Sequence, residues 1–319
     1  MFETTQRRTS PSGAVLAYHH EPARIDAIGV LVICHGLAEH SRRYRPFAES
    51  MAGAGFHTYA HDHRGHGETT AEDATLGRFA WKDGVRHVIH DTKAMRDFAA
   101  MAHPGLPILL FGHSMGGLIA LNVVETYPTG FDALAIWNSN FYPGVAGRVA
   151  EFLLKAERAL KGSDVPSTLL PKLTFATWNR SIGENRTDFD WLSRDHAAVD
   201  AYVADPLCGF DASVSLWLDI FELSFQGVKP ERLAKLPQAL PVHLVGGGCD
   251  PATNNGQAIK LLARQMQARG MTGIDCNIDP AMRHETLNEV DAVDAVSAFA
   301  AWATRVMPGV SPNTASDWE

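Results

Sequence analysis

Short apolar runs alternate with amphipathic stretches along the first 140 residues of the chain. The runs have the length and composition of strands that are buried in a sheet. They lie at 14–20, 27–34, 56–60, 108–111 and 133–137. The stretches between them predict helices, at 42–52, 85–102 and 118–124. Strands that alternate with helices predict an α/β fold, in which a mostly parallel central sheet carries helices on both faces.

Two further expectations concern the start of the chain and the start of the first predicted helix. Residues 1–13 are polar and are expected to be partly frayed, and the strand at 14–20 is expected to lie at an edge of the sheet. Ser41 stands directly before a predicted helix, where a serine side chain can cap the first free amides.

The alternation stops after residue 140. From 141 to 236 the chain predicts helices and loops, with many large apolar side chains such as Phe175, Trp178 and Trp191. Alternation then resumes with strands at 242–245 and 274–278, each followed by a helix. The simplest organisation is a sheet domain that carries an inserted helical cap. Its parts are a first core segment at 1–140, the cap at 141–236, a second core segment at 237–308 and a polar tail at 309–319.

Charge and composition argue against several classes of protein. The net charge of −8 disfavours nucleic acid and anionic membrane surfaces as partners. No apolar run reaches the length of a membrane span, and the first residues lack the apolar core of a secretory signal. The four cysteines form no CxxC pair and are typical of reduced thiols. We therefore expect a cytoplasmic protein without stable membrane insertion.

The strongest catalytic signal in the sequence is an apolar run that leads directly into the motif Gly112-His113-Ser114-Met115-Gly116. A strand, a tight turn and a helix form the context of a nucleophile elbow, which presents a serine at the tip of a strained turn. Side chains at Gly112 and Gly116 would collide with neighbouring chain. The helix behind the turn directs its first amides at any anion formed there. Ser114 is the predicted nucleophile.

A serine hydroxyl becomes nucleophilic when a base takes its proton and an acid orients that base. In this architecture the partners follow in the order Ser, Asp or Glu, His, each after a late strand. Asp250 follows one late strand through a glycine-rich turn, and His284 follows the next. Asp275 and Asp279 begin and end that second strand, so Asp250 is the predicted acid. The alternatives are a turn or capping role for Asp250 and a solvated loop for His284.

Two backbone amides are needed to stabilise the negative charge that develops on a substrate oxygen. One candidate is the amide of Met115, the residue after the nucleophile. The other is the amide of Leu37, in the loop His35-Gly36-Leu37 that follows an early strand. Alternatively, this loop only turns the chain.

Taken together, these residues resemble those of a known family. The matching stretches are His35-Gly36-Leu37-Ala38-Glu39-His40-Ser41, Arg43-Tyr44, Asp62-His63-Arg64-Gly65-His66-Gly67, Gly112-His113-Ser114-Met115-Gly116-Gly117, Asp205-Pro206-Leu207, Asp250-Pro251 and His284-Glu285-x-Leu287-Asn288-Glu289. The chain resembles the α/β-hydrolase superfamily, and within it the serine hydrolases that include monoacylglycerol lipases, bacterial lysophospholipases and the serine aminopeptidase S33 group. The glycine run before Asp250 departs from the pattern of that family.

The resemblance implies an α/β-hydrolase fold with Ser114, Asp250 and His284 as the triad and Leu37 and Met115 as the oxyanion amides. It implies no metal and no organic cofactor. The expected enzyme is a carboxylic ester hydrolase that acts through an acyl-enzyme. Its expected substrate is a small-molecule ester: a monoacylglycerol, a lysophospholipid or another apolar ester. Nothing in the sequence indicates an oligomeric state.

Other functions stay open beside this one. An amidase, aminopeptidase or acyltransferase uses the same triad on the same fold. A non-catalytic binding protein is disfavoured because all three triad residues are present. The segment 61–66 is similar to the HxHxDH signature of dinuclear metallo-hydrolases, but Gly65 stands where that signature has aspartate. The apolar cap residues are expected to line an acyl pocket, unless they form only the core of the cap.

Overall fold

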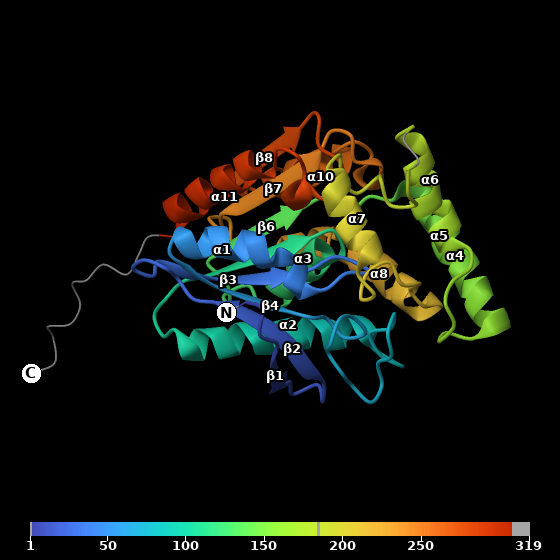
Figure 1. Cartoon of the computed structure of the whole chain (residues 1–319), viewed down its shortest axis with the longest axis horizontal. Coiled ribbons are helices and arrows are strands. Elements are labelled where there is room, and N and C mark those ends of the chain that lie inside the picture. Colours follow the sequence, from blue (N-terminus) through green and yellow to red (C-terminus); the bar gives the residue numbers. More distant parts are fainter. Residues whose placement is uncertain (1, 184–185, 308–319) are drawn as a thin grey trace, which may run out of the picture.

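The computed structural model describes residues 2–183 and 186–307, and an eight-stranded sheet lies at its centre (Figure 1). The strands are β1 (Gln6–Thr9), β2 (Val15–Glu21), β3 (Gly29–Cys34), β4 (Phe56–His61), β5 (Ile108–His113), β6 (Ala133–Trp137), β7 (Val242–Gly247) and β8 (Ile274–Asp279). Their order in space is β1-β2-β4-β3-β5-β6-β7-β8. The strands β3 to β8 run parallel, whereas β2 is antiparallel to both of its neighbours. The expectation of a mostly parallel sheet is confirmed.

One edge of the sheet differs from the prediction. The segment expected to be partly frayed forms β1, which pairs with β2 from Gln6 opposite Tyr18 to Thr9 opposite Val15. The strand β2 is therefore the second strand and not the edge. The sequence of β1, QRRT, is almost entirely exposed and carries no apolar signal, so backbone pairing holds it in place.

Helices cover both faces of the sheet. On one face lie α1 (Arg45–Gly53) and α11 (Ala292–Val306), and on the other lie α2 (Gly84–Ala102), α3 (Met115–Thr126) and α10 (Gln257–Gln267). In the first layer the rings of Phe47 and Phe299 pack against Phe111 and Trp137, with ring centroids 5.0–6.4 Å apart. These contacts fix the helices to the central strands.

The start of α1 also differs from the expectation. A 3-10 turn, η1 (Ser41–Tyr44), precedes the helix. The hydroxyl of Ser41 donates to Oδ1 of Asp62 at 2.6 Å, and Ser41 caps no helix. The side chain therefore ties the loop after β3 to the loop after β4.

Between β6 and β7 the chain forms only helices. They are α4 (Gly144–Lys161), α5 (Leu170–Leu173), α6 (Phe175–Ser181), α7 (His196–Ala204), α8 (Val214–Gln226) and α9 (Pro230–Leu233). Figure 1 shows α4, α5 and α6 on one side of the molecule, away from α1 and α11. Helix α8 contacts α4 as well as α2 and α3, so it joins the two groups of helices. The division into core and cap at residues 141 and 236 remains our proposal, and the expected polar tail lies outside the described residues.

No helix in the described part of the chain combines the length and the apolar character that a membrane span needs.

A buried network of charges joins the loop after β3 to the loop after β8. Arg43 donates two hydrogen bonds of 2.7 Å to the carboxylate of Glu285 and one of 2.6 Å to that of Glu39. His113, at the end of β5, lies 3.5 Å from Glu39 through Nδ1 and 3.0 Å from the carbonyl oxygen of His284 through Nε2. Three chain segments that are distant in sequence are thus held at one place.

The network keeps both carboxyl groups ionised. Burial raises the pKa of Glu39 and of Glu285, but the Arg43 guanidinium and His113 together outweigh it. The pKa of Glu39 therefore lies well below its usual value, and the pKa of Glu285 also lies below it. Such a pair stabilises the folded chain only while its cation is present.

We expect Arg43→Gln to lower the free energy of unfolding by about 3–5 kcal/mol at neutral pH, because two buried carboxylates lose their cation. In the unaltered protein the lowered pKa values of Glu39 and Glu285 stabilise the fold above the ordinary pKa of 4.5, and this stability is lost as the pH falls. Without Arg43, burial raises both pKa values. The difference between the two proteins should therefore be largest at pH 7–8 and shrink towards pH 4.

Urea unfolding followed by circular dichroism between pH 4 and pH 8 measures this difference. Arg45→Gln, which removes an exposed cation paired with Glu3 and Glu49, serves as the control and should change the free energy of unfolding far less than Arg43→Gln does. A loss for Arg43→Gln that is equal at every pH would contradict the electrostatic explanation.

Candidate active site

Ser114 lies in the turn between β5 and α3. Its backbone angles, φ 53° and ψ −120°, are rare for a residue with a side chain. A Cβ atom at Gly112 would lie 2.2 Å from the carbonyl oxygen of Gly116, and one at Gly116 would lie 2.0 Å from that of Cys34. The turn therefore requires both glycines, as the motif predicted.

The structure brings Ser114, His284 and Asp250 together. Oγ of Ser114 lies 2.9 Å from Nε2 of His284, and Nδ1 of His284 lies 3.0 Å from each carboxylate oxygen of Asp250. The three residues follow β5, β8 and β7, so they meet at the carboxyl edge of the parallel strands. An acid, an imidazole and a hydroxyl in this order can move a proton off the hydroxyl.

Asp250 is fully buried and well supplied with hydrogen bonds. Its carboxylate accepts bonds from the amide of Ala252 at 2.9 Å, from Oγ1 of Thr253 at 2.8 Å and from Nδ2 of Asn138 at 3.1 Å. Burial raises the pKa of Asp250, but the adjacent His284 and these donors outweigh it, so the pKa lies below its usual value. The ionised carboxylate holds the Nδ1–H of His284 and leaves Nε2 directed at the serine.

The alternatives for these two residues can now be judged. Asp250 does cap a short 3-10 turn, η2 (Pro251–Thr253), so the capping role and the place beside His284 coexist. His284 is only 4% exposed and is not a solvated loop residue. Asp279 accepts bonds from the amides of the next loop, and Asp275 faces Arg305, so neither takes the place of Asp250.

The glycine-rich run before Asp250 has a structural cause. A Cβ atom at Gly247 would lie 2.2 Å from the carbonyl oxygen of Arg283 and 2.3 Å from that of Met282. The loop that carries His284 therefore lies directly against the end of β7, and only glycine leaves room for it.

Leu37 and Met115 line the same cavity as Ser114. Within the described residues, neither backbone amide has a hydrogen-bond acceptor. Met115 is the first residue of α3, so the positive end of that helix lies behind its amide. An oxyanion hole needs two free backbone donors of this kind in the cavity of the nucleophile.

The cavity that opens from Ser114 and His284 has a volume of about 750 Å³. Several of the apolar residues that the sequence placed in the cap line it: Leu153, Leu170, Phe175, Trp178, Trp191, Trp217, Ile220 and Phe221. Others, such as Leu154 and Leu216, are buried in the core. The ring of Trp191 lies 4.9 Å from that of His284, so the helical segment closes over the candidate site.

Sequence reasoning missed Asn138, which directly follows β6. Its backbone has φ 52°, and its side chain donates to Asp250 and accepts from the hydroxyl of Thr286. The available signal was the position of this asparagine, because Ser114 and Asp250 also follow the carboxyl ends of parallel strands.

The ring nitrogens of the histidines in the segment 61–66 do not converge as the ligands of one metal ion would. His61, His63 and His66 are buried, and burial lowers the pKa of His61 and of His66 to about 3. Within the described residues, the groups whose ligand atoms lie within 4.8 Å of one another include none of these three. His63 instead donates its amide to Nε2 of His35, which joins the loops after β4 and β3.

Comparison with known proteins agrees with this geometry. Residues 26–291 match the family described as serine aminopeptidase, S33. The monoacylglycerol lipase of Mycolicibacterium smegmatis is 27% identical over 285 residues, which cover 87% of this chain and 88% of that protein. The human monoglyceride lipase is 28% identical over 64% of this chain and 65% of its own length.

Among solved structures, a thermostable carboxyl esterase from Bacillus coagulans has a TM-score of 0.86 at 22% identity, with 95% of this chain and 98% of that chain covered. This likeness shows the α/β-hydrolase fold. The expected resemblance is thereby confirmed, and the names of these relatives agree with the expected class of carboxylic ester hydrolases. The family match covers most of the chain, and the protein is a member of the serine aminopeptidase S33 family.

Proposed function

We propose that this protein is a serine carboxylic ester hydrolase that cleaves monoacylglycerols, lysophospholipids or similar apolar esters. The observation that carries the proposal is the hydrogen-bonded series Asp250–His284–Ser114, which ends in a large apolar cavity. The two lipases named above support the same class of substrate.

The reaction proceeds in two halves. Nε2 of His284 takes the proton of Ser114 as Oγ attacks the ester carbonyl, and the amides of Leu37 and Met115 donate to the resulting oxyanion. When the tetrahedral intermediate collapses, His284 gives the proton to the leaving alcohol and the acyl group stays on Ser114. Water then attacks the acyl-enzyme with the same base, and the carboxylic acid leaves. Asp250 stabilises the imidazolium in both halves.

An aminopeptidase or other amidase is the second candidate, because the family description names that activity. An aminopeptidase has to bind the charged amino group of its substrate. In the described part of the cavity the acidic residues are Glu39 and Glu285, and both are already paired with Arg43. The cavity therefore favours an uncharged, apolar substrate. An acyltransferase differs only in the acceptor of the acyl group.

Ser114→Ala should remove nearly all turnover, because loss of a triad serine costs on the order of a million-fold. A fluorophosphonate probe should label the unaltered protein at Ser114 and should not label the variant. Ser224→Ala, which changes another serine of the cavity, is the control and should still be labelled. Labelling that survives Ser114→Ala would exclude Ser114 as the sole nucleophile.

Asp250→Asn should lower kcat by about four powers of ten, because the amide holds His284 in the wrong tautomer. Asp279→Asn is the matched control and should have little effect. Steady-state kinetics on one ester measures both variants. If Asp279→Asn does the damage and Asp250→Asn is mild, the acid is misassigned.

For esters of rising acyl length, kcat/KM should increase from acetyl to at least octanoyl, because each buried methylene contributes about 0.8 kcal/mol. Anilides of the same acids should react far more slowly. Ala150→Trp, which fills part of the cavity, should shorten the best acyl chain, whereas Phe152→Ala on the exposed side of α4 should not. A steady fall beyond acetyl would contradict an acyl pocket, and anilides that match the esters would favour the amidase.

A further inference from the structure

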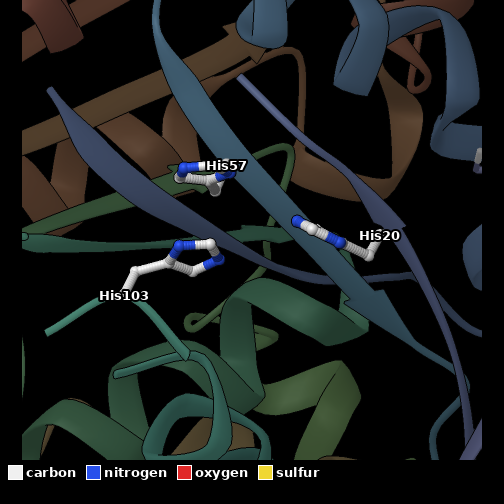
Figure 2. A group of neighbouring side chains, drawn as sticks. All are labelled: His20, His57 and His103. Atoms are coloured by element: carbon white, nitrogen blue, oxygen red, sulfur yellow. The ribbon is translucent and has the colours of Figure 1, made fainter. Parts of the chain in front are cut away.

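Three histidines lie together on the face of the sheet that α2 covers (Figure 2). His20 belongs to β2, His57 to β4, and His103 directly follows α2. His20 is opposite Tyr59 in the strand pairing, and Tyr59 follows His57 by two positions, so these side chains leave the same face. The cluster lies at the amino end of β4, whereas Ser114 follows the carboxyl end of β5.

The three rings are close enough to share one ion. A ring nitrogen of each histidine lies within 4.8 Å of the other two. The rings of His57 and His103 stack with centroids 3.7 Å apart, and the ring of His20 is 5.8–5.9 Å from both. Three nitrogens around a tetrahedral zinc ion stand about 3.3 Å apart. To bind one ion, the rings of His57 and His103 have to turn out of their stacked arrangement, while the strands and the end of α2 hold the Cα atoms in place.

Each ring offers a nitrogen to a metal. Nε2 of His20 is buried and has no hydrogen-bond partner among the described residues. Nε2 of His103 lies 2.8 Å from the hydroxyl of Tyr59, so Nδ1 is left to bind the ion. The hydrogen bond to Tyr59 would orient the ring of His103. Nδ1 of His57 accepts a 3.2 Å bond from the amide of Ala23. Binding through Nε2 of His57 would break that bond, so the affinity should be moderate.

The chemistry of the group selects the type of metal. Neutral imidazole is the form that binds a metal. The group contains imidazoles and no carboxylate, which suits zinc, copper and nickel and does not suit magnesium or calcium.

We propose that His20, His57 and His103 form a binding site for a late first-row divalent metal ion, with zinc as the expected ion and water as the fourth ligand. The ion joins β2, β4 and the end of α2. It stabilises this side of the sheet and takes no part in the chemistry at Ser114, so the site is independent of the proposed esterase activity.

The described residues hold one other group of this kind: His40, Asp205 and Cys208. There Nε2 of His40 is already 2.8 Å from the carboxylate of Asp205. Burial raises the pKa of the Cys208 thiol, which therefore keeps its proton at neutral pH. This group is the weaker candidate, and the experiment separates the two.

Calorimetric titration of the tag-free full chain with zinc chloride tests the proposal. We expect one ion per chain with a micromolar Kd, and a rise of Tm of about 4 °C when zinc is present at a hundredfold excess over Kd. His57→Gln and His103→Gln should each weaken binding about tenfold or more. His90→Gln, a half-buried histidine of α2 outside the cluster, and Cys208→Ser should leave the titration unchanged.

A second measurement uses only the unaltered protein, in case a variant fails to fold. Diethyl pyrocarbonate modifies accessible imidazoles, and mass spectrometry locates the modified residues. Zinc should protect His20, His57 and His103 and should not protect His90. The proposal is overturned if protection falls elsewhere, if no ion binds, or if both folded glutamine variants bind zinc as tightly as the unaltered chain.

Discussion

The close approach of backbone to backbone at the end of β5 is the constraint on which the candidate active site depends. The turn at Ser114 is strained, and such a conformation persists only where its surroundings determine it. The amide of Ser114 donates to the carbonyl oxygen of Trp137 at 2.9 Å, and its own carbonyl accepts from the hydroxyl of Ser139 at 2.8 Å. The end of β6 therefore holds the turn on one side, and the loop after β3 holds it on the other.

The same edge of the sheet gathers loops that are far apart in the chain. The loop with His284 lies against β7, where Gly247 leaves room for it, and the Arg43 network ties its neighbour Glu285 to the loop after β3. The distance between Ser114 and His284 therefore depends both on the packing at Gly247 and on the ion pairs of Arg43. A change in the ion network would therefore act on the site through the position of these loops.

Periodicity predicted the buried strands of the sheet and missed the polar strand β1. The strand at 133–137 was predicted with the bounds it has, because all five of its residues are buried. The strand β1 was missed because none of its four residues is apolar and three of them are exposed. The motif predicted Ser114 as the nucleophile. Asp250 and His284 could be predicted because each follows a late strand of the sheet. Asn138 and the cluster of His20, His57 and His103 depend on contacts between distant strands, which no local pattern reports.

The charges on the two edge strands affect how copies of the protein meet in solution. An unpaired strand offers its free amides and carbonyls to any neighbouring chain. Here β1 is short and carries Arg7 and Arg8, and the opposite edge, β8, carries Asp275 and Asp279. Two copies that approach through the same edge meet like charge, which opposes joining of their sheets. A β1 edge that meets a β8 edge instead brings Arg7 and Arg8 towards Asp275 and Asp279, so charge opposes only the joining of like edges.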